Sequence, residues 1–192
     1  MSIQILSPLK PHEDTKNQFI INKILPKSVS ETEKLVAQAF DCIEDENFSD
    51  ALKLYNLALK EEPENTSILI DKGATLQNMG KLKLAIRTYD KALSISPDNI
   101  DALLNKGSTL HSLEQYLEAI ECYDTALRID KKCAIALAYK GLSLGEMGQL
   151  TESIKHFKKA LSIDKHYELA SISKEIAQEL LKSINAKKSK IL

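Results

Sequence analysis

The chain has 192 residues, of which 43% are hydrophobic and 28% are charged, a composition typical of a soluble globular protein. Its 26 basic and 27 acidic residues nearly balance, which argues against a surface that attracts nucleic acid or an anionic membrane. Three cysteines without a CxxC pair favour reduced thiols and a cytoplasmic protein. The sequence has no apolar run long enough for a membrane span and no signal-peptide pattern at its start.

The first 30 residues are predicted to form an irregular N-terminal leader. Pro8, Pro11 and Pro26 lie there, and proline interrupts regular structure. Residues 18–27 combine apolar side chains with two lysines. Two places for this segment stay open. It occupies a groove formed by the later helices, or it packs on the outer side of the first helix.

Beyond the leader, apolar residues recur at helical spacing, and short breaks separate one helix from the next. Pro63 and Pro97 each follow an apolar helical stretch and predict a helix end. We expect four helix–turn–helix pairs and then a longer helix at about 167–185. The paired helices are predicted at 33–45, 49–61, 66–79, 83–95, 100–113, 117–129, 134–147 and 151–163.

The same residue types return at a step of 34 residues along the middle of the chain. A fixed period of this length indicates one supersecondary unit that is repeated and stacked. Small residues are expected where the two helices of a pair cross, with an aromatic ring beside them. The positions that keep the step include Gly73, Gly107 and Gly141; Ala85, Ala119 and Ser153; Tyr55, Tyr89, Tyr123 and Phe157; and Leu35, Leu69, Leu103 and Leu137.

This pattern of Leu, Gly or Ala, then Ala, Tyr or Phe, Ala and Pro resembles the tetratricopeptide repeat, although the family's tryptophan is replaced by leucine. The resemblance implies an all-α fold, a right-handed alpha-alpha superhelix (solenoid) of four tetratricopeptide helix-turn-helix repeats plus a C-terminal capping helix. The expected segments are the irregular leader at 1–30, four repeats within 31–165 (about 32–65, 66–99, 100–133 and 134–167), the capping helix at 166–186 and a basic flexible tail at 187–192.

The closing helix repeats the apolar pattern of a first helix two residues early, starting at Leu169. Its other face is charged, which is typical of a cap that keeps the end of a repeat array soluble. Leu180, Leu181 and Ile184 extend its apolar stripe. The alternative is therefore a helix that joins two copies of the chain.

No pattern in the sequence predicts catalysis. The chain lacks GxSxG, a Walker loop, HExxH and a kinase signature. None of its four histidines has a metal ligand at ligand spacing on the same helix face, and Cys42 falls on the core stripe of its helix. We expect a protein that is not an enzyme and holds no metal or cofactor.

In this family the first helices of the repeats line a concave groove, and the resemblance implies the same here. Of the 24 residues that would face the groove, five are acidic and none is Lys or Arg, where about three basic residues would match the chain's average. Basic side chains gather instead on the second helices and turns, which predicts a basic outer surface: Lys53, Lys60, Lys81, Lys83, Lys91, Arg128, Lys155, Lys158 and Lys159. These residues predict a partner segment that is apolar with some basic residues. The expected contact residues are Asp71, Asn78, Asp101, Leu104, Asn105, His111, Tyr139, Leu142 and Glu146.

Some members of the family hold a C-terminal carboxylate with a clamp of Lys, Asn and Arg. Asn105 matches one clamp asparagine, but Ile135 and Tyr139 occupy the places of the clamp lysine and arginine. The resemblance therefore implies a non-enzymatic protein–protein interaction adaptor or scaffold without this clamp. The alternative is a structural self-assembly module that forms homo-oligomers through the closing helix or the leader. Neither nucleic acid nor membrane is an expected partner.

Overall fold

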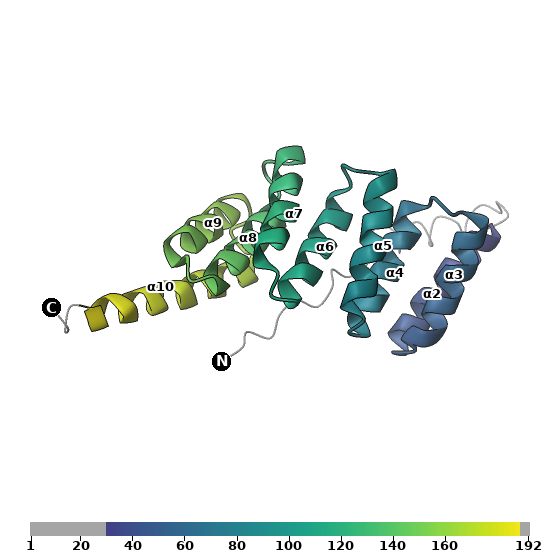
Figure 1. The fold of residues 1–192 in the computed structure, drawn as a ribbon, viewed down its shortest axis with the longest axis horizontal. Coiled ribbons are helices and arrows are strands. Elements are labelled where there is room, and N and C mark those ends of the chain that lie inside the picture. The colour runs from purple at the N-terminus through teal and green to yellow at the C-terminus, as the bar shows by residue number, and fades with distance from the viewer. Residues whose placement is uncertain (1–29, 189–192) are drawn as a thin grey trace. The chain divides into compact units, whose positions relative to one another are not determined.

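The computed structural model of the chain describes residues 30–188, which divide into two compact units (Figure 1). Unit 1 ends at Pro97 and unit 2 begins at Asp98. The helices of unit 1 are α2 (Glu31–Glu44), α3 (Phe48–Glu61), α4 (Thr66–Asn78) and α5 (Leu82–Ile95). The helices of unit 2 are α6 (Ile100–Ser112), α7 (Tyr116–Ile129), α8 (Ala134–Glu146), α9 (Leu150–Ile163) and α10 (Glu168–Lys188). The predicted leader lies outside the described residues.

Each unit consists of helix–turn–helix pairs that pack on one another. In unit 1, α2 pairs with α3, α4 pairs with α5, and α3 packs on α4. In unit 2, α6 pairs with α7, α8 pairs with α9, α7 packs on α8, and α10 packs mainly on α9. All nine helices in the described part of the chain begin and end within three residues of the predicted bounds. The predicted all-α class is confirmed.

The last helix is longer than predicted. α10 continues to Lys188, so the predicted tail at 187–192 is wrong for its first two residues. Residues 182–188 contain neither Gly nor Pro, and the lysines at this end of the helix interact favourably with the helix dipole. The remainder of the predicted tail, 189–192, lies outside the described residues.

One residue with left-handed backbone geometry marks the turn inside each pair. Gly80 and Gly148 have φ angles of 70° and 75°, and Glu46 and Glu114 have φ angles of 58° and 60°. These four positions keep the 34-residue step. Glycine adopts this geometry without steric cost, while other residues lose about 1–2 kcal/mol. The breaks predicted at these places are therefore the turns of the pairs.

A side-chain cap begins α4, α6 and α8 at equivalent positions. Asn65 accepts a hydrogen bond from the Ile68 backbone N–H at 3.2 Å, and Asn99 accepts one from Ala102 at 2.8 Å. The same place before α8 holds Cys133, whose sulfur accepts from the Ala136 N–H at 3.5 Å. Sulfur is a weak acceptor, so α8 has the weakest of these three caps.

Cys133→Asn is expected to raise the free energy of unfolding by about 0.5–1 kcal/mol, because an amide oxygen caps the helix better than a neutral thiol. Chemical denaturation followed by circular dichroism measures the change. The reverse replacement, Asn99→Cys, is the matched variant and should lower stability by a similar amount. A lower stability for Cys133→Asn would show that the cap geometry at α8 differs from that at α6.

A glycine meets an aromatic ring where the helices of three pairs cross. A Cβ atom built on Gly107 would lie 2.5 Å from Cε1 of Tyr123, and one built on Gly141 would lie 2.7 Å from Cε1 of Phe157. Gly73 has the same relation to Tyr89. All three rings are buried, so the backbone of the first helix rests directly on the ring. The prediction of small residues at the crossings is confirmed.

The crossings also differ from pair to pair. In the first pair Ala39 takes the glycine position and is fully buried, and Phe40 meets Tyr55 edge-on with ring centroids 6.4 Å apart. In the α8–α9 pair, Ser153 Oγ donates a hydrogen bond to the Gly141 carbonyl oxygen at 2.7 Å. That bond satisfies a buried hydroxyl and fixes the two helices against each other.

Candidate functional site

The first-helix face of unit 1 consists of the predicted groove residues on α2 and α4, namely Glu33, Val36, Ala37, Phe40, Ile43, Glu44, Ser67, Ile70, Asp71, Ala74, Gln77 and Asn78. None of its twelve positions is buried. Phe40, Ile43 and Ile70 are half-buried, so each leaves part of an apolar side chain accessible. Asp71 of α4 is also half-buried, and its charge adds to the effect of burial in raising the pKa of Tyr55. This face therefore combines accessible apolar surface with a carboxylate.

The corresponding first-helix face of unit 2, on α6 and α8, is largely closed. Seven of its twelve positions are buried, Ile135 and Gly145 are half-buried, and Asp101, Ser112 and Glu146 are exposed. Within this unit α6 contacts α8 directly. The Tyr139 ring meets Tyr123 edge-on, with centroids 5.8 Å apart. The seven buried residues are Leu104, Asn105, Ser108, His111, Ala138, Tyr139 and Leu142.

The nine predicted contact residues fall into two groups by accessibility. Asp71 is half-buried, while Asn78, Asp101 and Glu146 are exposed. The other five have exposed fractions between 2% and 9% and serve the packing of unit 2: Leu104, Asn105, His111, Tyr139 and Leu142. Asp71 and Asn78 belong to unit 1, and the other seven residues belong to unit 2.

His111 links the two first helices of unit 2. Its Nδ1 atom lies 2.8 Å from Ser143 Oγ on α8, a hydrogen-bonding distance, and its ring meets Tyr116 edge-on at 5.2 Å. Only 3% of the residue is exposed, and burial lowers the pKa of the imidazole. A neutral imidazole thus holds α6 against α8.

Stability is expected to fall as the pH drops below about 6.5, the ordinary pKa of histidine. The folded chain holds His111 at a lowered pKa, so in this window the unfolded chain binds the proton first. A buried histidine of this kind lowers the free energy of unfolding by up to about 1.4 kcal/mol per pH unit. The loss ends once the pH falls below the lowered pKa of the folded state. Denaturant midpoints at pH 7.5 and 5.5 measure the effect.

His111→Gln should reduce this pH dependence, while His166→Gln, at an exposed position, is the matched control. The dependence should not vanish, because burial, followed by the charges of Lys140 and Lys159, also lowers the pKa of His156. Equal pH dependence in the two variants would contradict a neutral, buried His111.

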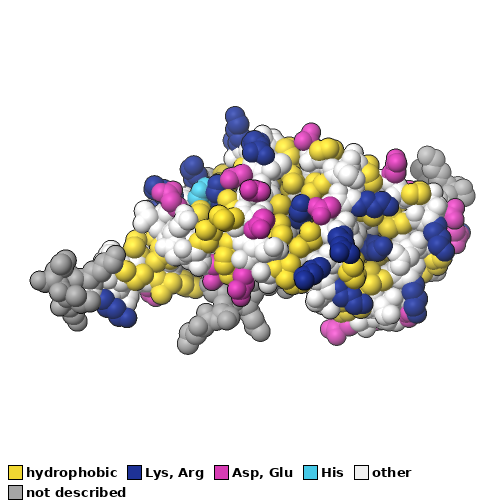
Figure 2. Space-filling view, viewed as in Figure 1, with side chains coloured by type: hydrophobic (Ala, Val, Ile, Leu, Met, Phe, Trp, Pro, Cys, Tyr) yellow, Lys and Arg dark blue, Asp and Glu magenta, His cyan; other side chains and the backbone are white. Residues whose placement is uncertain are grey.

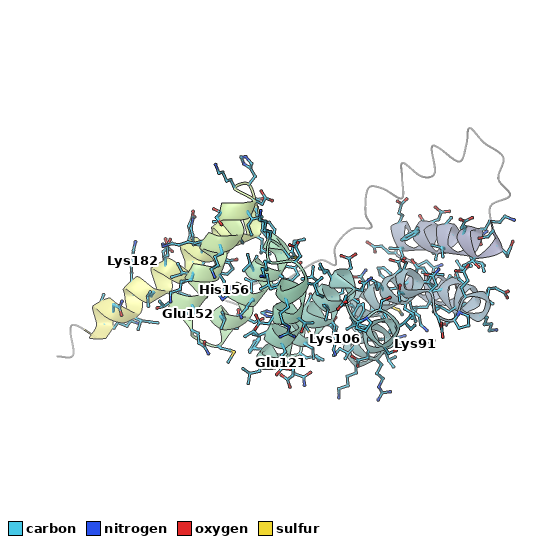
Figure 3. All side chains as sticks on the ribbon, turned by 90° about the horizontal axis from the view of Figure 1, so that it is seen from above. Lys91, Lys106, Glu121, Glu152, His156 and Lys182 are labelled. Atoms are coloured by element: carbon cyan, nitrogen blue, oxygen red, sulfur yellow. The ribbon has the colours of Figure 1, made fainter. Side chains whose placement is uncertain are left out.

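The outer side of unit 2 carries its own polar contacts. Lys140 on α8 donates to Asp124 Oδ1 on α7 at 2.5 Å, and the lysine side chain is only 17% exposed. His156 of α9, labelled in Figure 3, has a buried Nδ1 atom with no hydrogen-bonding partner. The Lys140–Asp124 pair therefore ties the first helix α8 to the preceding second helix α7, and neither it nor His156 belongs to the first-helix face.

Charge is distributed unequally between the first and second helices. The five acidic residues of the first-helix faces are all exposed or half-buried: Glu33, Glu44, Asp71, Asp101 and Glu146. The lysines and the arginine predicted for the outer surface are all exposed, and Figure 2 shows basic side chains gathered over α5. Some pair within their own helix, as Lys53 does with Asp50 at 2.7 Å, but exposed pairs contribute little stability.

Residues 30–188 contain neither a metal-binding cluster nor a membrane-spanning helix. No group of three or more His, Cys, Asp or Glu side chains there is placed to hold a metal ion. No helix in that range has the length and hydropathy needed to cross a membrane.

Solved structures of repeat proteins resemble this fold. The crystal structure of MamA gives a TM-score of 0.68 at 24% identity, covering 77% of this chain and 81% of that one. A tetratricopeptide repeat protein from Parabacteroides merdae ATCC 43184 gives 0.70 at 24% identity, over 80% and 61% of the two chains. The first TPR of Spaghetti (RPAP3), bound to the HSP90 peptide SRMEEVD, gives 0.59 at 20% identity, over 61% and 93%. At these identities the likeness is one of fold.

Sequence comparison gives the family itself. No curated protein matches the chain. A family model described as tetratricopeptide repeat matches residues 65–132 and again 98–166. Together these matches cover more than half of the chain and include the three glycine crossings and the turns at Gly80, Glu114 and Gly148. The protein is therefore a member of the tetratricopeptide repeat family.

Proposed function

We propose that this protein is a non-enzymatic adaptor or scaffold that binds an extended segment of a partner protein along its first-helix faces. The observation that carries the proposal is the composition of these faces. They present accessible acidic residues and half-buried apolar residues, and no Lys or Arg. A segment with apolar side chains and a few basic residues complements such a surface.

Unit 1 supplies the larger share of the proposed contact. Phe40, Ile43 and Ile70 leave apolar surface accessible, and burial of such surface is the main source of binding free energy. Asp71 lies on the same face and selects for a basic side chain. The exposed amide of Asn78 both donates and accepts hydrogen bonds, so it suits the backbone of an extended segment. In unit 2, the exposed Asp101 and Glu146 give the first-helix face of that unit the same preference for basic side chains.

The charge preference separates this protein from one relative of the same fold. The RPAP3 domain was solved with an HSP90 peptide, SRMEEVD, that ends in acidic residues. In the present chain an acidic segment would meet Asp71 and Asp101 with no Lys or Arg on the first-helix faces to offset them. Anionic ligands are therefore disfavoured, and basic ones are favoured.

A displayed library of random peptides tests the proposal. The full chain should enrich segments that combine large apolar residues with Lys or Arg. Asp71→Lys should weaken binding of the enriched peptides about tenfold, while Glu118→Lys, an exposed position on the second helix α7, is the matched control. A chain that enriches no peptide, or peptide affinities that fall equally in both variants, would reject the first-helix face of unit 1 as the binding surface.

A further inference from the structure

An apolar ridge runs along α10. It consists of Ile172, Ile176, Leu180 and Ile184, with exposed fractions of 49%, 39%, 50% and 42%. Each residue is four positions from the next, and side chains at this spacing form one continuous row on a helix. Figure 2 shows hydrophobic side chains gathered along α10. Single exposed aliphatic residues are ordinary, but a contiguous row marks an interaction surface.

A different face holds α10 to the rest of unit 2. Ala170, Ser173 and Ala177 are buried. Ala177 forms an apolar cluster with Leu150 and Ile154 of α9, and Leu181 packs against it. The ridge lies beside this face, and each of its residues leaves between 39% and 50% of its surface exposed. It is therefore available to another molecule without any change in the fold of unit 2.

We propose that the ridge binds the same ridge of a second copy of this chain. The two α10 helices run antiparallel about a two-fold axis that passes between Ile176 and Leu180. In this arrangement Ile176 of each copy packs against Leu180 of the other, and Ile172 packs against Ile184. A two-fold contact of this kind uses one self-complementary surface on both copies.

The charges beside the ridge favour the antiparallel arrangement. Glu175 and Lys182 are exposed and seven residues apart, so they lie on the same flank of the helix, on opposite sides of the ridge midpoint. Figure 3 shows where Lys182 lies on α10. The two-fold axis places Glu175 of each copy opposite Lys182 of the other, which forms two opposite-charge pairs. In a parallel arrangement the same flank of the two copies would lie on opposite sides of the contact, and these charge pairs would not form.

The expected dimer is weak. Glu179 lies on the same flank close to the axis, so it faces Glu179 of the second copy and opposes the contact. The ridge is also a single row on one helix, and stable dimers bury about 1,200–2,000 Å² in total. We therefore expect association that depends on protein concentration, and not a permanent dimer.

Sedimentation velocity of the full chain from about 1 µM to 1 mM spans the range of weak association. The mass should rise from one copy towards two, and Ile176→Glu/Leu180→Glu should keep the chain monomeric throughout. Leu57→Glu, which changes an equally exposed leucine on α3 (45% exposed), is the matched control and should not alter the mass. Circular dichroism confirms that each variant is folded.

Charge reversal tests the orientation of the two helices. Glu175→Lys and Lys182→Glu should each weaken the dimer, and the double variant should restore it, because the pairs re-form with opposite sign. Glu179→Gln should strengthen the dimer. These measurements do not involve Asp71 or the first-helix face of unit 1, so dimerisation and segment binding succeed or fail separately.

Three results would overturn the proposal. They are a monomer at every concentration, a dimer unaffected by Ile176→Glu/Leu180→Glu, and a double charge reversal that fails to restore association. If the chain is monomeric and hydrogen exchange shows protection along 172–184, another part of the same chain covers the ridge in place of a second copy.

Discussion

Replacing Gly107 with leucine should lower the free energy of unfolding by at least about 1–3 kcal/mol. Even the first atom of the new side chain would lie 2.5 Å from Cε1 of Tyr123, well inside van der Waals contact. The Tyr123 ring has an exposed fraction of 0% and has no room to move aside. The helices α6 and α7 must therefore separate, which disrupts the packing of unit 2. Chemical denaturation with two independent probes measures the loss.

Ser112→Leu is the control for Gly107→Leu, since it adds the same side chain to an exposed position on the same helix. It should change stability by about 0.5 kcal/mol or less. A second check is the double variant Gly107→Ala/Tyr123→Leu. The double variant should lose less free energy of unfolding than the sum of the losses in the two single variants, because leucine at position 123 leaves space for the new methyl group. If the melting temperature of Gly107→Leu were unchanged, position 107 would not be the point at which α6 and α7 cross.

The fold was predictable because its determinants repeat. Gly73, Gly107 and Gly141 occupy equivalent positions in successive repeats, and each meets the ring 16 positions later. Once the glycine and the ring of one crossing are recognised in the sequence, the repeat gives the residues of the other crossings. The end of α10 was less predictable, because no Gly or Pro marks it and lysines are compatible with both helix and tail.

The accessibility of the site could not be predicted in the same way. Periodicity shows which residues share a helix face, but not how closely the next first helix approaches that face. Leu104 and His111 were expected to contact a partner, and the structure buries them. The half-buried Phe40 and Ile70 in unit 1 were assigned to the same face but not chosen as contacts. The spacing of the sequence is similar in both units, so it held no signal for this difference.

Sequence did give one indication of what buries His111. Ser143 and His111 lie 32 residues apart, almost one repeat, so they belong to neighbouring first helices. A pair of polar residues at that distance fits a hydrogen bond between helices, but it fits two solvated side chains equally well. Only the 2.8 Å distance between their atoms decides between these two interpretations.

At the aromatic position of the second helices, the fold requires the ring but not the hydroxyl of tyrosine. Tyr55, Tyr89, Tyr123 and Phe157 are all buried. The Tyr89 hydroxyl contacts Gln77 Oε1 at 3.4 Å, whereas the hydroxyls of Tyr55 and Tyr123 are buried without a hydrogen-bonding partner in the described structure. Burial raises the pKa of Tyr123 far above its usual range. Phe157 does without a hydroxyl, so the ring is the part that the fold requires.

Tyr123→Phe should therefore leave stability unchanged or raise it by up to about 1 kcal/mol, because it removes a buried hydroxyl that has no partner. Tyr123→Ala should lower stability by about 3–5 kcal/mol, because it leaves a cavity beneath Gly107. Tyr89→Phe is the matched control and should lose a few tenths of a kcal/mol, since the contact with Gln77 is long. Denaturant midpoints of the three variants measure the difference. If Tyr123→Phe were less stable than Tyr89→Phe, the Tyr123 hydroxyl would have to donate to a buried water, and its role would be structural after all.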